Sequence, residues 1–178
     1  MAQPPTIDRE ALHAEMERAR TEFHRFLGAA DAEALRRRTD GTRWTNEQML
    51  FHMLFGYFLV RALRVLVVGM DRAPRWCSRS FAGALNATTR PFHTVNYLAS
   101  CAGATVIDHR RAGRRFDRTV AALHRRLDAE TDTDLARGMH FPPGWDPFFK
   151  RYMTLAELYH YATVHFDFHQ RQLTIDRG

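Results

Sequence analysis

An all-α four-helix bundle is the fold that the 178-residue sequence predicts. Several long stretches carry apolar residues at three-to-four spacing, which is typical of helices that bury one face. Two helix starts are marked by capping boxes, formed by Thr45 with Gln48 and by Thr154 with Glu157. No segment shows the apolar–polar alternation of a half-buried strand. We therefore expect one domain over residues 1–178, with long connections between the second and third helices and between the third and fourth.

Three of the four helices have clear limits. The first is expected over residues 7–28, where Leu12 begins an apolar face and Gly28 is a suitable stop. The second is expected over 45–68, from the first capping box to a closing glycine. The fourth is expected over 154–174, from the second capping box onward.

The middle of the chain is less regular. Residues 71–91 contain Pro, Ser, Gly and Asn without a sustained period, so we expect a long connection with a helical turn around 81–85. The third helix is expected over 102–129, because Phe116 and Val120 share an apolar face while arginines occupy the others.

Composition points to a soluble protein of a reducing compartment. Cys77 and Cys101 are too few for a disulfide scaffold, which favours the cytoplasm, and the first residues lack the pattern of a signal peptide. The longest apolar stretch, Met49–Met70, is interrupted by Arg61 and Arg64, whose burial in a bilayer would cost a few kcal/mol each. We therefore interpret it as the central helix of a bundle and expect no membrane association.

The net charge of +6 comes almost entirely from arginine, since Lys150 is the only lysine. Arginine pairs and triplets occur at 36–38, 110–111, 114–115 and 125–126. Such clusters bind phosphates or carboxylates, including those of DNA, but they also form solvated helix faces in proteins from GC-rich genomes. We favour solvated faces, and hence no nucleic-acid partner, because no nucleic-acid motif accompanies the charge.

A histidine pair in the fourth helix is the main candidate for function. His165 and His169 are four residues apart, so their side chains lie on one helix face about 6 Å apart and can share a metal ion. The stripe that carries them also contains Tyr161 and Gln172. The pair lacks the glutamate of the H-E-x-x-H motif, because position 166 is phenylalanine.

A third ligand is proposed from the second helix, where His52 lies among apolar residues. Three neutral imidazoles with a fourth position open are typical of a catalytic metal site. Gly56 follows one turn later on the same side and either leaves space beside the metal or allows close helix packing. Six other histidines are expected to be core or surface residues: His13, His24, His93, His124, His140 and His160.

These residues resemble the DinB/YfiT-like superfamily. The resemblance rests on the Trp44-Thr45 helix start followed by His52, and on the terminal His165-x-x-x-His169, and it covers nearly the whole chain. It implies an up-down-down-up bundle that holds a divalent metal, with zinc or nickel expected, on His52, His165 and His169. Relatives in that superfamily include thiol S-transferases and a mycothiol-dependent isomerase.

The function expected from this resemblance is metal-dependent transfer or isomerisation with a low-molecular-weight thiol such as mycothiol. A Lewis-acid metal lowers the pKa of the thiol, so no cysteine nucleophile is required. Arg43 or Arg171 would anchor carboxylates of the thiol, and the second substrate would be a small electrophile.

Two alternatives remain open. A hydrolase would use the same metal to ionise water, but it needs a base, and the nearby polar side chains are Tyr161, Asp167 and Gln172. A non-catalytic stress-response or DNA-associated protein would use the arginines of the third helix. The sequence also leaves open whether the bundle forms a homodimer.

Overall fold

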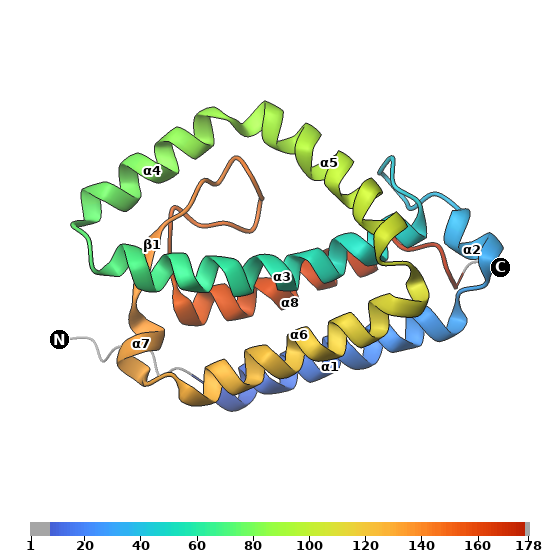
Figure 1. The fold of residues 1–178 in the computed structure, drawn as a ribbon, viewed down its shortest axis with the longest axis horizontal. Helices are drawn as coiled ribbons and strands as arrows, with labels where there is room; N and C mark the ends of the chain where they lie inside the picture. The colour runs from blue at the N-terminus through green and yellow to red at the C-terminus, as the bar shows by residue number, and fades with distance from the viewer. Residues whose placement is uncertain (1–7, 177–178) are drawn as a thin grey trace.

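The computed structural model describes residues 8–176, and within them the fold is an all-α bundle of four long helices. These are α1 (Arg9–Ala29), α3 (Asn46–Asp71), α6 (His109–Ala129) and α8 (Leu155–Gln170). In Figure 1, α1 and α8 run in one direction and α3 and α6 in the other. The order along the chain is therefore up-down-down-up, as the resemblance implied.

Shorter elements connect the bundle helices. They are α2 (Ala32–Arg36), α4 (Arg75–Ala87), α5 (Thr89–Val106), α7 (Asp132–Ala136), β1 (Gly138–His140) and β2 (Tyr152–Thr154). The two strands form an antiparallel hairpin in which Met139 pairs with Met153. The expectation of no strand was therefore wrong at this point, because three-residue strands are too short to show alternation.

The prediction of an irregular connection over 71–91 is also wrong, because most of these residues belong to α4 and α5. The two helices meet at Thr88, which ends one and precedes the other. Pro91 lies in the first turn of α5, where a missing backbone N–H breaks no helical hydrogen bond. What resembles a loop in the sequence is a corner between two helices.

The third predicted helix, 102–129, divides into two elements in the structure. Its first residues belong to α5, and α6 begins only at His109. Asp108 caps the new helix by accepting a hydrogen bond from the backbone N–H of Arg111 at 3.0 Å. Gly103 lets α5 approach α3 closely, because a Cβ there would lie 2.1 Å from the ring of Phe51.

The other helix predictions agree with the structure to within a few residues. Both capping boxes are present, and α8 ends at Gln170, four residues before the expected limit. The expected first helical residue, Ile7, lies outside the described residues.

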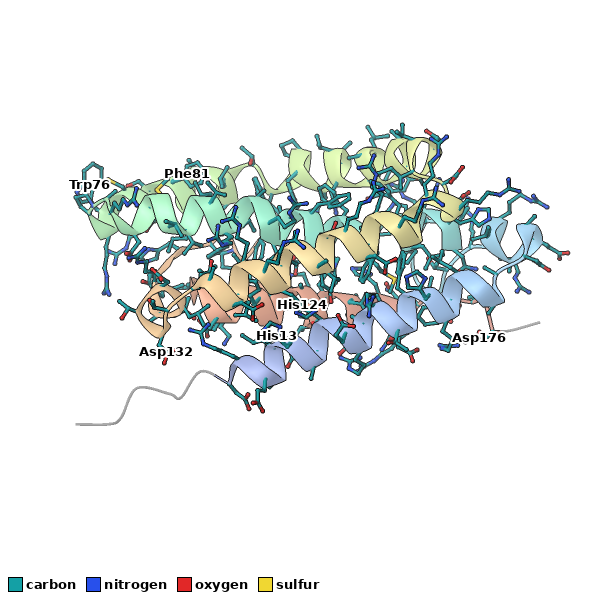
Figure 2. The ribbon with its side chains drawn as sticks, turned by 60° about the horizontal axis from the view of Figure 1, so that its bottom comes forward. His13, Trp76, Phe81, His124, Asp132 and Asp176 are labelled. Carbon is teal, nitrogen blue, oxygen red and sulfur yellow. The ribbon has the colours of Figure 1, made fainter. Side chains whose placement is uncertain are left out.

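The core lies between the four bundle helices. Phe23 of α1 stacks on Phe116 of α6 with ring centroids 4.4 Å apart, and Tyr57 and Phe166 pack against the same ring. All four side chains are buried. At its edge, His13 and His124 bring their Nδ1 atoms to 2.5 Å across α1 and α6 (Figure 2).

Within the described residues, α3 is the one helix long and apolar enough to cross a membrane by length and composition, with a mean hydropathy of 1.8. Such a helix is equally typical of a bundle core. Here α3 packs against α5, α6 and α8, as expected for the central helix of a bundle.

The two capping boxes predict a measurable contribution to stability. Thr45→Ala and Thr154→Ala should each lower the free energy of unfolding by about 1 kcal/mol, because each removes a side-chain acceptor from a helix N-terminus. Urea denaturation monitored by circular dichroism measures this. Thr133→Ala is the control, since Thr133 is exposed and caps no helix, and its effect should stay within about 0.5 kcal/mol. Wild-type midpoints for both cap variants would contradict the assignment.

Candidate metal centre

The structure brings the three predicted histidines into one buried group. His52 lies in the second turn of α3, and His165 and His169 lie in the C-terminal half of α8. Their exposed fractions are 5%, 3% and 9%, respectively. Each offers one ring nitrogen to a set whose members all lie within 4.8 Å of one another. This spacing could hold a single metal ion, with one ligand atom from each side chain.

Hydrogen bonds orient two of the imidazoles. Nδ1 of His52 lies 3.1 Å from Oγ of Ser100 on α5. Nδ1 of His169 lies 2.7 Å from Oε1 of Gln172, an acceptor, so that nitrogen carries the proton. In both rings Nε2 makes no hydrogen bond to any described residue. Because Nδ1 of the neutral His169 ring carries the proton, its Nε2 has a free lone pair. Partners of this kind fix the ring orientation and the tautomer of metal-binding histidines.

His165 has a different environment. Its Nδ1 is buried and has no hydrogen-bond partner among the described residues. The ring lies against Gly56 of α3, where a Cβ would come within 2.7 Å of the same nitrogen. The glycine therefore makes space for the imidazole itself. The structure agrees with both roles expected for Gly56, since this residue packs against His165 and also lines the small space beside His52 and His165.

All three imidazoles are held in their neutral form. Burial, with a smaller contribution from His169, lowers the pKa of His52 to about 3. Burial and the two neighbouring histidines hold the pKa of His165 well below its ordinary value. Burial also lowers the pKa of His169, although Gln172 opposes this shift. Neutral imidazoles are the form that binds metal ions.

Asp146 is a site residue that the sequence analysis missed. Its Oδ2 lies 3.8 Å from Nε2 of His165 and accepts a hydrogen bond from the hydroxyl of Tyr161 at 2.8 Å. Its Oδ1 accepts from the backbone N–H of Phe148 at 2.8 Å. Burial raises the pKa of the Asp146 carboxyl, and these hydrogen bonds oppose the rise. Its only sequence signal was its place in the Pro- and Gly-rich segment before the last helix.

Asp167, one of the polar candidates for a catalytic base, does not face the site. Its carboxylate accepts two hydrogen bonds from the guanidinium of Arg18 on α1, at 2.9 and 2.8 Å. Tyr161 and Gln172 do contact the site, through Asp146 and His169.

The loop between β1 and β2 closes the site from above. It lies beneath the arch that α4 and α5 form over α3 in Figure 1. Trp145 of the loop stacks on Phe92 with centroids 4.0 Å apart and donates its indole N–H to the carbonyl of Leu85 at 2.7 Å. The space left beside His52 and His165 is about 20 Å³, enough for about one water molecule. A larger ligand therefore requires this cover to open.

Aromatic side chains connect the histidines to an arginine at the surface. Trp44 stacks on His52 with centroids 4.5 Å apart and on Tyr97 at 6.0 Å. The guanidinium of Arg43 lies 4.4 Å from the centroid of the Tyr97 ring. Because Arg43 is exposed and contacts Tyr97, it lies where this row of rings reaches the surface, at the edge of the site.

The other histidines do not join the group. His160 contacts Glu15 on α1. His24 contacts Asp117, and His140 contacts Ser78. Among the described residues, the group of His52, His165 and His169 is the one set of three or more ligands close enough to share a metal.

Comparison with known proteins identifies the family. Neither the curated proteins nor the solved structures contain a significant match to this chain. A family model does match: that of the DinB superfamily, over residues 15–173. This span includes α3, α6 and α8 in full, most of α1, and the three clustered histidines. The match covers most of the chain and agrees with the bundle and its topology, so the chain belongs to the DinB superfamily.

Proposed function

We propose that His52, His165 and His169 bind a divalent transition metal, zinc or nickel, and that the site activates a small thiol for transfer or isomerisation. The donor set supports the metal. The three imidazoles are neutral, Nε2 of His52 and of His169 makes no hydrogen bond to a described residue, and Nδ1 of His165 is buried without a partner. An unpartnered polar atom in an apolar interior costs about 1–3 kcal/mol, and a bound cation would remove that cost where it meets the lone pair.

When bound, the metal would supply Lewis acidity that lowers the pKa of a thiol, or in the alternative of water, at its open position. Three neutral ligands leave the charge of the ion uncompensated, which favours an anionic sulfur ligand. The residues around the space beside His52 and His165 suit a soft, apolar group. They include Phe55, Leu59, Phe92, Trp145 and Phe149.

The remaining residues of the site would position the substrates. Arg43, held over Tyr97, is placed to bind a carboxylate of the thiol at the site edge. Trp44 covers one face of His52 and keeps bulk water from it. Among the described residues, the Arg171 side chain has no hydrogen bond, ion pair or ring contact that links it to the site, so Arg43 is the anchor that we propose.

Asp146 gives the hydrolase alternative a specific basis. The sequence offered no glutamate on the ligand face, and Asp167 pairs with Arg18, yet the loop places a carboxylate beside His165. A carboxylate in that position could accept a proton from water. Tyr161 and the Phe148 amide already donate to its two oxygens, which favours a structural role that holds the loop in place.

Metal binding tests the first half of the proposal. Zinc or nickel should bind to the wild-type protein with one ion per chain, and His169→Ala should abolish tight binding while leaving helical content unchanged. Isothermal titration calorimetry at neutral pH measures both. His160→Ala, on the exposed side of α8, is the control and should bind normally. Binding should persist at pH 6, because burial holds the pKa of His52 at about 3, and should be lost in stronger acid. Absence of uptake by the wild-type protein would refute the proposal.

Gly56 provides an independent test of the position of His165. Gly56→Ala should weaken metal binding by about 10- to 100-fold, because the new Cβ would displace the imidazole. Gly69→Ala in the same helix is the matched control, since its Cβ would meet nothing within 4 Å. That variant should bind metal normally and gain up to about 1 kcal/mol of stability. Equal metal affinities for the two variants would show that the contact is unimportant.

The Asp146→Asn variant distinguishes thiol chemistry from hydrolysis as the activity of the site. The metal-loaded protein should accelerate the addition of mycothiol, or a related thiol, to a chromogenic electrophile, and His169→Ala should abolish this rate. Asp146→Asn should retain most of it, because the carboxylate takes no proton in the thiol reaction. Bacillithiol and glutathione are the comparison thiols. Thiol-independent cleavage of a nitrophenyl ester that Asp146→Asn abolishes would instead establish the hydrolase.

A further inference from the structure

A second pocket lies between α3 and α6, away from the histidines, with a volume of about 400 Å³. Its lining includes four arginines, two from each helix: Arg61, Arg64, Arg125 and Arg126. The remainder is Val65, Ala122 and Leu123. Arg61 follows His52 by nine residues, which at about 3.6 residues per turn places it half a turn round α3. The two sites are therefore on opposite sides of the same helix.

Most of the positive charge in this pocket is uncompensated. Among the described residues, none forms an ion pair or a hydrogen bond with the guanidinium of Arg61, Arg125 or Arg126. Arg64 differs, because its Nε donates to the buried carboxylate of Glu130, which anchors it. The lining itself contains no carboxylate. Three unpaired guanidiniums that line one hollow attract anions, since their fields add.

We infer that this pocket binds a small organic molecule that carries a phosphate group. A phosphate brings about 1.5 to 2 negative charges at neutral pH and oxygens in several directions, which suits guanidiniums approaching from two helices. A carboxylate is planar and carries one charge. The volume of the pocket is larger than a phosphate ion needs. It lies in the range of about 300–1,000 Å³ that is typical of ligand sites. Val65 and Leu123 offer an apolar surface for the attached organic part.

A small ligand fits this surface better than nucleic acid does. A duplex presents phosphates along an extended backbone and is bound by a long basic surface or by an element inserted in a groove. Here the arginines face a hollow between two helices. The sequence favoured a solvated helix face for the arginine pair at 125–126. For this pair we now infer a role in ligand binding instead.

The test is calorimetric titration with inorganic pyrophosphate after chelator treatment, so that no metal at the histidines can bind the probe. Arg61→Gln/Arg125→Gln should bind pyrophosphate at least about tenfold more weakly than wild type, because each guanidinium contributes a charge-assisted hydrogen bond. Both side chains are exposed and unpaired, so circular dichroism should show an unchanged fold. Arg64 is left intact, because its loss would leave Glu130 buried without a partner.

The control variant is Arg36→Gln/Arg110→Gln, which removes the same charge from exposed arginines outside the pocket. It should bind pyrophosphate like wild type.

Equal losses in the two double variants, or no binding by wild type at millimolar pyrophosphate, would overturn the inference. Citrate binding as tight as pyrophosphate would overturn the phosphate assignment. Duplex DNA bound more tightly than pyrophosphate, and lost in the pocket variant, would identify a nucleic-acid surface instead. Zinc uptake should be normal in both variants, which keeps this test separate from that of the metal site.

Discussion

The burial of three imidazoles between α3 and α8 is the constraint on which the rest of the structure depends. A buried imidazole needs a partner for each ring nitrogen, because water is excluded from the interior. Ser100 and Gln172 supply one partner each for His52 and His169, and His165 has none at Nδ1. The group is thus incomplete as a set of hydrogen bonds and well arranged as a set of metal ligands. Gly56 reflects the same constraint, since any side chain there would occupy the space of the His165 ring.

The arch of α4 and α5 gives this group its environment. Ser100 of α5 reaches His52, and the loop between β1 and β2 is fixed to the arch by Trp145. The same loop places Asp146 beside His165. Access to the site is therefore controlled by elements outside the bundle. Differences in this cover would change which substrates reach the histidines without changing the four helices that hold them.

Helix α3 carries two unlike surfaces. One side presents His52 and Gly56 to α8, and the other presents Arg61 and Arg64 to the pocket against α6. Between them, buried residues such as Tyr57 fill the core. A helix with these two polar sites and an otherwise apolar surface needs partners on several sides. This explains both the membrane-like composition of α3 and its central place in the bundle.

The sequence by itself determined those features that depend on neighbours along the chain. The capping boxes at Thr45 and Thr154 defined two helix starts, and the i, i+4 spacing placed His165 and His169 on one face. The tertiary structure decided what depends on packing between distant segments. The corner at Thr88 lacks a local signature, because neither α4 nor α5 has a side-chain cap, and both helices pack against α3. Asp146 could not be found from spacing, since its contact with His165 is made by a loop fixed to α4. The arginine pocket likewise exists only where two helices meet, because charge along one helix does not reveal the hollow between them.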